Sequence, residues 1–300
     1  MSTPDLGRAA EFLTTHARLL ERRLAALHGG TGDAHGVLDA LAAYRNPGGG
    51  LGHALEPDVR APDSQPLAVD FGLEVVEQVL DSPAGHDPEV RGRARELAAG
   101  LLPYLAEVAA PGGGLPIVLP SAAGHPRAAH WGDCRFPPGL NPTGNIVARL
   151  RMLGLSSTWL DAAESFCRGE IDALVAAADP PDAHTAGNAW RYLRSAPDRA
   201  WAERRSAQLA DRMAAMPLLH LHPGEGYGLT PLDLAPTPDH PLRPLFPAGA
   251  VAAHLTALGE AQQPDGGWPL AWQPPGPAAV LEWRGVVTGN ALRVLTAHDR

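Results

Sequence analysis

Apolar residues recur at steps of three and four along most of this chain. Val90, Ala94, Leu97 and Leu101, for example, would share one face of a helix. Valine, isoleucine and threonine do not gather in the alternating runs that strands need, so we expect an all-α protein. A small β-hairpin near 217–246 is the one exception that the pattern allows. The predicted helices span residues 6–28, 34–44, 65–80, 88–109, 143–153, 157–178, 183–195, 198–215, 247–262 and 286–298.

Glycine-rich clusters follow several of these helical segments. Glycine commonly ends a helix, so each cluster marks a predicted helix end. Three later helix starts resemble one another, with threonine as the expected N-cap. This recurrence predicts a ring or solenoid of helix–loop–helix units that forms one domain over residues 1–300. The clusters lie at 46–50, 111–114, 223–226 and 264–268, and the starts are Thr143-Gly144-Asn145, Thr185-Ala186-Gly187-Asn188 and Thr288-Gly289-Asn290.

The last glycine cluster carries the most specific motif. Residues 261–269, with the sequence Ala-Gln-Gln-Pro-Asp-Gly-Gly-Trp-Pro, resemble the glutamine–tryptophan repeat of squalene and oxidosqualene cyclases. In that repeat a glutamine caps a helix and a tryptophan packs over the neighbouring unit. The resemblance implies the capping role for Gln262 or Gln263 and the packing role for Trp268.

The repeat as a whole resembles the α/α toroid of terpenoid cyclases and protein prenyltransferase β-subunits, in which inner and outer helices surround a central cavity. The combination of the stretches 56–58, 62–64 and 281–285 resembles that of uncharacterised bacterial prenyltransferase-like proteins. The chain lacks the Asp-x-Asp-Asp motif of class II cyclases and the Asp-Asp-x-x-Asp motif that binds magnesium diphosphate. Polysaccharide lyases and glycoside hydrolases share the toroid, so the fold alone does not decide the chemistry.

Charge and composition narrow the range of partners. The formal net charge is −9, and because lysine is absent all 24 basic residues are arginine. An acidic chain lacks the basic surface that nucleic acids and anionic membranes require, and lysine-based covalent chemistry is excluded. No apolar run is long enough for a membrane span, and the first residues lack the apolar core of a signal segment. We expect a cytoplasmic protein that acts on a small, apolar molecule without a cofactor.

The loop after the first glycine cluster carries the main candidates for catalysis. His53, Glu56, Asp58 and Asp63 lie close together, and acid and base groups in such a loop can transfer protons. We assign Glu56 and Asp58 as candidate catalytic residues, and His53 and Asp63 as candidate substrate contacts. The alternative is that these carboxylates cap helices or solvate turns beside the prolines.

The loop after the second cluster places a histidine, a tryptophan, an aspartate, a cysteine and an arginine within a few positions. Trp131 and Asp133 are candidate substrate contacts. This group, or the pair His220 and His222, has metal-binding side chains, but no repeated ligand spacing supports a metal and we assign none. The alternative is that Trp131 covers the core and Asp133 pairs with Arg135.

Aromatic and charged residues gather near the C-terminus. Trp268, Trp272 and Trp283 are candidate substrate contacts, because tryptophan rings stabilise cations and stack on sugars. Glu282 is a third candidate catalytic carboxylate, and Arg284 a candidate binding residue. The alternative is that Trp268 and Trp283 pack as wedges between adjacent helices and that Glu282 pairs with Arg284.

The asparagines Asn145, Asn188 and Asn290 recur at equivalent helix starts. They would either hydrogen-bond a common ligand or satisfy neighbouring backbone groups.

Three functions follow from these observations. The first is a terpenoid-cyclase-like or prenyltransferase-like enzyme that acts on an isoprenoid, with Glu56 or Asp58 as proton donor and the tryptophans as apolar lining. The second is a carbohydrate lyase or hydrolase that uses paired carboxylates and Arg284. The third is a non-catalytic binding or scaffolding ring.

Overall fold

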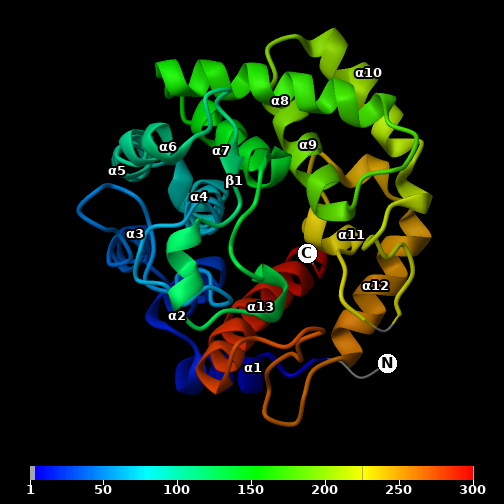
Figure 1. Ribbon diagram of the computed structural model, residues 1–300. Coiled ribbons are helices and arrows are strands. Elements are labelled where there is room, and N and C mark those ends of the chain that lie inside the picture. Colours follow the sequence, from blue (N-terminus) through cyan, green and yellow to red (C-terminus); the bar gives the residue numbers. More distant parts are fainter. Residues whose placement is uncertain (1–3, 225, 300) are drawn as a thin grey trace. The chain divides into compact units, whose positions relative to one another are not determined.

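The computed structural model describes residues 4–224 and 226–299. The described chain is mostly α-helical with one small two-stranded sheet, which confirms the all-α fold class. It divides into two compact units, whose helices are labelled in Figure 1. We call residues 1–33 together with 217–300 the terminal unit, and residues 34–216 the central unit. Within the described residues, no helix combines the length and apolar character needed to cross a membrane.

Helix α7 lies at the centre of the packing in the central unit. It contacts α4, α8 and α9 (Figure 1), and its residues Ile146, Val147 and Leu150 are fully buried. The elements of this unit are α3 (Ala34–Ala42), α4 (Pro66–Asp81), η1 (Pro83–His86), α5 (Pro88–Ala99), α6 (Leu102–Val108), β1 (Leu115–Pro116), η2 (Pro120–Gly124), η3 (Ala129–Trp131), β2 (Pro138–Gly139), α7 (Leu140–Met152), α8 (Thr158–Ala176), α9 (Ala183–Ser195), α10 (Arg199–Ala210) and η4 (Met213–Ala215).

The terminal unit combines both ends of the chain. Its longest helix, α13, packs against α1, α2 and α12. Apolar side chains of α1 and α13 enclose Trp268, which is 1% exposed. The elements are α1 (Leu6–His16), α2 (Leu19–His28), α11 (Pro231–Leu234), η5 (Arg243–Leu245), α12 (Ala248–Glu260) and α13 (Pro277–His298).

Two of the predicted helices are each divided in two. The helix expected at 6–28 is interrupted at Ala17 and Arg18, whose backbones are extended. The helix expected at 88–109 ends at Gly100, and α6 then begins with a proline in its first turn. Apolar periodicity continues through both breaks, which is why the sequence pattern did not reveal them.

The small antiparallel sheet pairs β1 with β2 and does not lie in 217–246, where the sequence allowed a hairpin. The described part of 217–246 holds α11, η5 and an isolated parallel bridge between Leu219 and Leu229. The last helix begins at Pro277 rather than at 286, because proline is well suited to the first turn of a helix.

Three glycine clusters fold in the same way, which supports the predicted repeat. In each loop, the backbone carbonyl of one residue accepts a hydrogen bond from the N–H of the residue three positions later. The N–H of the same first residue donates to the carbonyl of the residue four positions later. The third residue is a glycine with φ of 90–93°, and a Cβ atom there would collide with the backbone of a neighbouring segment, so only glycine fits. The sets are Asn46 with Gly49 and Gly50, Ala110 with Gly113 and Gly114, and Gln263 with Gly266 and Gly267.

The threonines of the repeated helix starts hold these loops in place. Thr143 Oγ1 accepts the N–H of Leu115 at 2.9 Å, and Thr288 Oγ1 accepts the N–H of Trp268 at 3.0 Å. Both threonines lie inside helices, so the prediction that they are N-caps is wrong. Thr185 instead hydrogen-bonds to the aspartate that caps α9.

Candidate functional site

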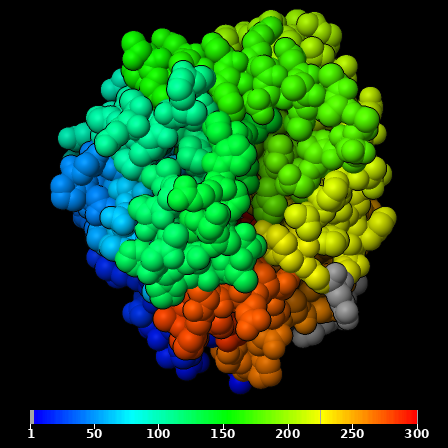
Figure 2. Space-filling model, viewed as in Figure 1, coloured from blue at the N-terminus to red at the C-terminus, as the bar shows by residue number. Residues whose placement is uncertain are grey.

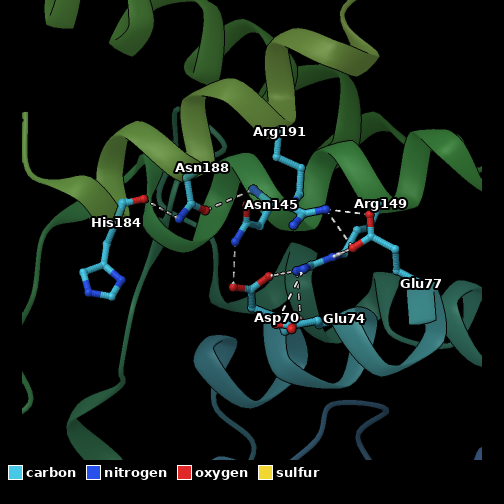
Figure 3. Close-up of polar contacts among 8 residues, drawn as sticks. All are labelled: Asp70, Glu74, Glu77, Asn145, Arg149, His184, Asn188 and Arg191. Atoms are coloured by element: carbon cyan, nitrogen blue, oxygen red, sulfur yellow. Dashed lines mark hydrogen bonds and ion pairs between the residues drawn. The ribbon is translucent and has the colours of Figure 1, made fainter. Parts of the chain in front are cut away.

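Helix α4 presents three carboxylates on one side. Asp70, Glu74 and Glu77 follow the i, i+4, i+7 spacing that brings side chains together on a helix surface (Figure 3). Leu73 and Val76, which lie between them in sequence, are at most 1% exposed and fix α4 in the core of the central unit. The acids are therefore held on a rigid element.

Arginines from two other helices meet this row of acids. The side chain of Arg149 on α7 is 3% exposed and pairs with Asp70, with Glu77 at 3.0 Å and with Glu74 at 3.7 Å (Figure 3). Arg191 on α9 adds a second guanidinium, whose Nη1 lies 2.5 and 2.7 Å from the two carboxylate oxygens of Glu77. Together with two asparagines these residues form a polar cluster, which consists of Asp70, Glu74, Glu77, Asn145, Arg149, Asn188 and Arg191.

Two asparagines connect α9 to α7 and α7 to α4. Asn188 Oδ1 accepts the backbone N–H of Asn145 at 3.1 Å, and Asn188 Nδ2 donates to the carbonyl of His184 at 3.0 Å. Asn145 Nδ2 donates to Asp70 Oδ2 at 3.1 Å (Figure 3). Asn188 thus satisfies backbone groups, as one interpretation of the sequence had it, whereas Asn145 binds a carboxylate.

The four most enclosed ionisable groups of the cluster have shifted pKa values. Burial and the nearby Glu74 raise the pKa of Asp70 by more than Arg149, Asn145 and Arg191 lower it. Burial also acts to raise the pKa of Glu77, but the two arginines hold that pKa at about 2. Burial lowers the pKa of Arg149, and the surrounding carboxylates more than compensate. Burial and the nearby Arg149 together lower the pKa of Arg191. The pKa of Asp70 is thus raised and that of Glu77 lowered, although both carboxyl groups pair with Arg149.

The charges of the cluster are consistent with the raised pKa of Asp70. When all are ionised, three carboxylates face two guanidiniums, which leaves one negative charge. Both guanidiniums contact Glu77, whereas Asp70 shares Arg149 with the two glutamates. Enclosed sites disfavour uncompensated charge, so a proton on Asp70 makes the group neutral. A carboxyl group that can hold and release a proton in this way can act as a general acid.

The first-loop candidates lie in the turn that precedes α4, in the same unit. Glu56 and Asp58 are 7% and 4% exposed. Glu56 Oε2 accepts the N–H of Asp58 at 3.0 Å, and the carbonyl of Asp58 accepts the N–H of Ala128 at 2.9 Å. His53 and Asp63 are exposed. Their predicted roles in catalysis and binding remain predictions.

The second-loop candidates belong to a segment that packs on its own small core, and its surface faces the viewer in Figure 2 (blue-green). Trp131 is 9% exposed and meets Phe136 edge to face at 5.8 Å. Asp133 is exposed and accepts the N–H of Arg135 at 3.1 Å, so the suggested pairing of these two residues is found. Cys134 is buried, which raises the pKa of its thiol.

The terminal unit carries an aromatic row. Trp272 and Trp283 meet edge to face with ring centroids 5.1 Å apart, and Tyr227 lies 5.9 Å from Trp272. Tyr227 is 44% exposed, and both tryptophans are partly exposed. Their role in substrate binding remains a prediction.

Trp268 and Gln262 hold the last glycine loop in place. Gln262 Oε1 accepts the N–H of Asp5 at 2.7 Å, just before α1, as the capping role implied by the resemblance would require. Trp268 is buried in the core of the terminal unit and donates from Nε1 to the carbonyl of Leu258 at 2.8 Å. Its environment is that of a packing residue.

Arg284 also has a structural environment. It makes two contacts of 2.7 Å to Asp265 and lies over the ring of Phe12, whereas the sequence suggested Glu282 as its partner. Glu282 is partly buried on α13, and Asn290 on the same helix is exposed.

Sequence reasoning found two members of the polar cluster, Asn145 and Asn188, but missed its charged residues. Two signals were present. Acids recur at i, i+4 and i+7 in an otherwise apolar helix, and arginines follow the repeated asparagines by four and three positions. The missed residues are Asp70, Glu74, Glu77, Arg149 and Arg191.

Among the described residues, no group of three or more histidine, cysteine, aspartate or glutamate side chains is arranged to hold a metal ion. Comparison with models of known protein families and with curated protein sequences gave no match.

Proposed function

We propose that this chain is an enzyme that transfers protons to and from a neutral, apolar substrate, with Asp70 as the general acid. One observation carries the proposal: an enclosed carboxyl group whose protonation neutralises the charged groups around it. The isoprenoid class of substrate follows from the resemblance of the sequence to terpenoid cyclases. In this proposal the proton donor is Asp70 of the polar cluster, whereas the sequence suggested Glu56 or Asp58.

The charge of the cluster favours a neutral substrate over a diphosphate. Arg149 and Arg191 are both engaged by Glu77, and the ionised cluster has a net negative charge. Diphosphates bind where cationic groups are free to contact them. Once Asp70 has given up its proton, the net negative charge of the cluster instead stabilises the positive charge that develops on the substrate.

In the proposed reaction, protonated Asp70 transfers its proton to a double bond or an epoxide oxygen of the substrate. The resulting carboxylate is stabilised by Arg149 and by the amide of Asn145. The substrate cation closes a ring or rearranges and then gives up one proton to solvent water, so that substrate and product are isomers. Asp70 regains a proton before the next turnover. Glu56 and Asp58, which are also buried, are to be tested in the same role.

A binding or scaffolding protein is the second candidate, and a different observation favours it. Arg149 and Arg191 find their carboxylate partners within the cluster itself. Ion pairs of this kind can have a purely structural role, in which they fix how the helices pack. In that case Asp70 would affect stability and not turnover.

The test combines thermal stabilisation by ligands with product analysis by gas chromatography and mass spectrometry. The purified 300-residue chain is incubated in parallel with neutral isoprenoids, prenyl diphosphates and acidic oligosaccharides. We expect neutral isoprenoids to raise Tm and to be converted. Turnover should fall by about 100-fold or more in Asp70→Asn. The matched control is Asp161→Asn, which removes a surface carboxylate of α8.

Each other outcome has a clear meaning. Full turnover by Asp70→Asn would contradict the assignment of the acid. Stabilisation by oligosaccharides alone would support the carbohydrate alternative. If no class of ligand raises Tm, the scaffolding function is favoured.

A further inference from the structure

Both polar atoms of the Asn188 side-chain amide are hydrogen-bonded. The residue is 5% exposed, its Oδ1 accepts the N–H of Asn145, and its Nδ2 donates to the carbonyl of His184 one turn earlier on α9. A side-chain amide that is bonded through both its oxygen and its nitrogen has a single orientation. Asn188 therefore acts as a rigid connection between α9 and the first part of α7 (Figure 3).

Gly144 makes this connection possible. A Cβ atom at this position would lie 2.8 Å from the carbonyl oxygen of Asn188, a distance that side chains do not tolerate. Regular helical geometry in α7 starts only after Asn141, so Asn145 lies near the helix start, where side chains from outside commonly supply acceptors. The Thr-Gly-Asn sequence thus lets α9 approach until Asn188 reaches the backbone of Asn145.

Asn145 in turn acts on the carboxyl group of Asp70. Its Nδ2 donates to Asp70 Oδ2, while Asp70 Oδ1 accepts from Arg149. Amide NH₂ and guanidinium groups only donate, so an acid proton on Asp70 has to point away from both. These two donors decide which lone pair of the carboxyl group is left to carry the proton.

We infer that Asn188 is a positioning residue that holds Asn145 against Asp70 and thereby fixes the direction in which Asp70 presents its proton. This inference rests on the proposed function of Asp70, but its physical basis is measurable without any substrate. The other charged groups that act on Asp70 are Glu74, which disfavours its ionised form, and Arg191, which favours it.

The test follows the protonation of Asp70 by infrared difference spectroscopy of its C=O stretch, assigned with Asp70→Asn. In Asn145→Leu the ionised form loses a hydrogen bond, so we expect the acid dissociation constant of Asp70 to fall about tenfold. In Asn188→Ser we expect a change in the same direction. The serine hydroxyl can bond the carbonyl of His184 but is too short to reach the N–H of Asn145.

The control is Asn290→Ser, because Asn290 ends a Gly-Asn sequence like that of Asn188 but is exposed on α13. It should leave the titration of Asp70 unchanged. If Asn188→Ser leaves it unchanged too, although Asn145→Leu shifts it, Asn188 is not a positioning residue. If Asn188→Ser does not fold, Asn188→Ala is measured in its place, with the same expectation.

Failure of this inference differs from failure of the proposed function. If Asp70→Asn retains turnover but Asn188→Ser shifts the titration of Asp70, the positioning holds and the catalytic role does not. If Asp70→Asn is inactive and Asn188→Ser leaves the titration unchanged, the catalytic role stands and the positioning is wrong.

Discussion

Glu77 is the acid of the polar cluster that both arginines hold, and its side chain is only 15% exposed. We expect Glu77→Gln to lower the free energy of unfolding by about 3 kcal/mol, because it leaves two guanidiniums underpaired in an enclosed site. Glu74→Gln is the matched control. Glu74 is 47% exposed and 3.7 Å from Arg149, so its loss should cost less than about 1 kcal/mol. Urea unfolding measures both, and equal costs would contradict the arrangement described here.

The lowered pKa of Glu77 predicts how the free energy of unfolding depends on pH. The folded protein holds the pKa of Glu77 at about 2, below its ordinary value of 4.5. The unfolded chain therefore binds the proton first, and the stabilisation is present above about pH 4.5 and lost as the pH falls toward 2. This effect contributes on the order of 3 kcal/mol to the free energy of unfolding at neutral pH.

Urea unfolding of wild type and Glu77→Gln between about pH 6 and pH 3 isolates this contribution, since other acids titrate in both proteins. The difference in stability between the two should shrink as the pH falls. A difference that stays constant would show that Glu77 is not held in its ionised form.

At the scale of elements, the repeated glycine loops give the sharpest prediction. Gly113 has φ of 90°, and a Cβ atom there would lie 2.6 Å from the backbone of Ala162 on α8. Gly113→Ala should lower the free energy of unfolding by about 1–3 kcal/mol. Gly112→Ala meets nothing within 4 Å and should change it by less than about 1 kcal/mol. Equal effects in thermal unfolding would argue against the shared loop geometry.

Most elements could be predicted because glycine clusters and apolar periodicity are local signals. The loops that end at Gly50, Gly114 and Gly267 share one hydrogen-bond pattern, and the sequence marked all three. Breaks such as the one at Ala17–Arg18 were not predicted. The backbones of these two residues are extended, but the spacing of apolar residues in the sequence continues through them unchanged. The threonines were misread as N-caps, since their partners are loop N–H groups distant in sequence.

At the scale of the whole molecule, the candidate site was harder to predict than the fold. Its ion pairs join residues 72 to 114 positions apart in the sequence, across three helices of the central unit. No local spacing shows that Arg191 and Glu77 meet. The asparagines were found because they recur in a motif, whereas the charged residues next to them looked like ordinary surface residues of amphipathic helices.

A pKa of Asp70 above its ordinary value is what the proposed acid role requires. Carbon-13 NMR of aspartate carboxyl groups, with the Asp70 signal assigned from Asp70→Asn, measures this most directly. We expect Asp70 to titrate above its ordinary pKa of 3.8, because burial and Glu74 outweigh its contacts with Arg149, Asn145 and Arg191. Titration at or below 3.8 would contradict the proposed acid role, since Asp70 would then be an ionised partner of Arg149 and not an acid.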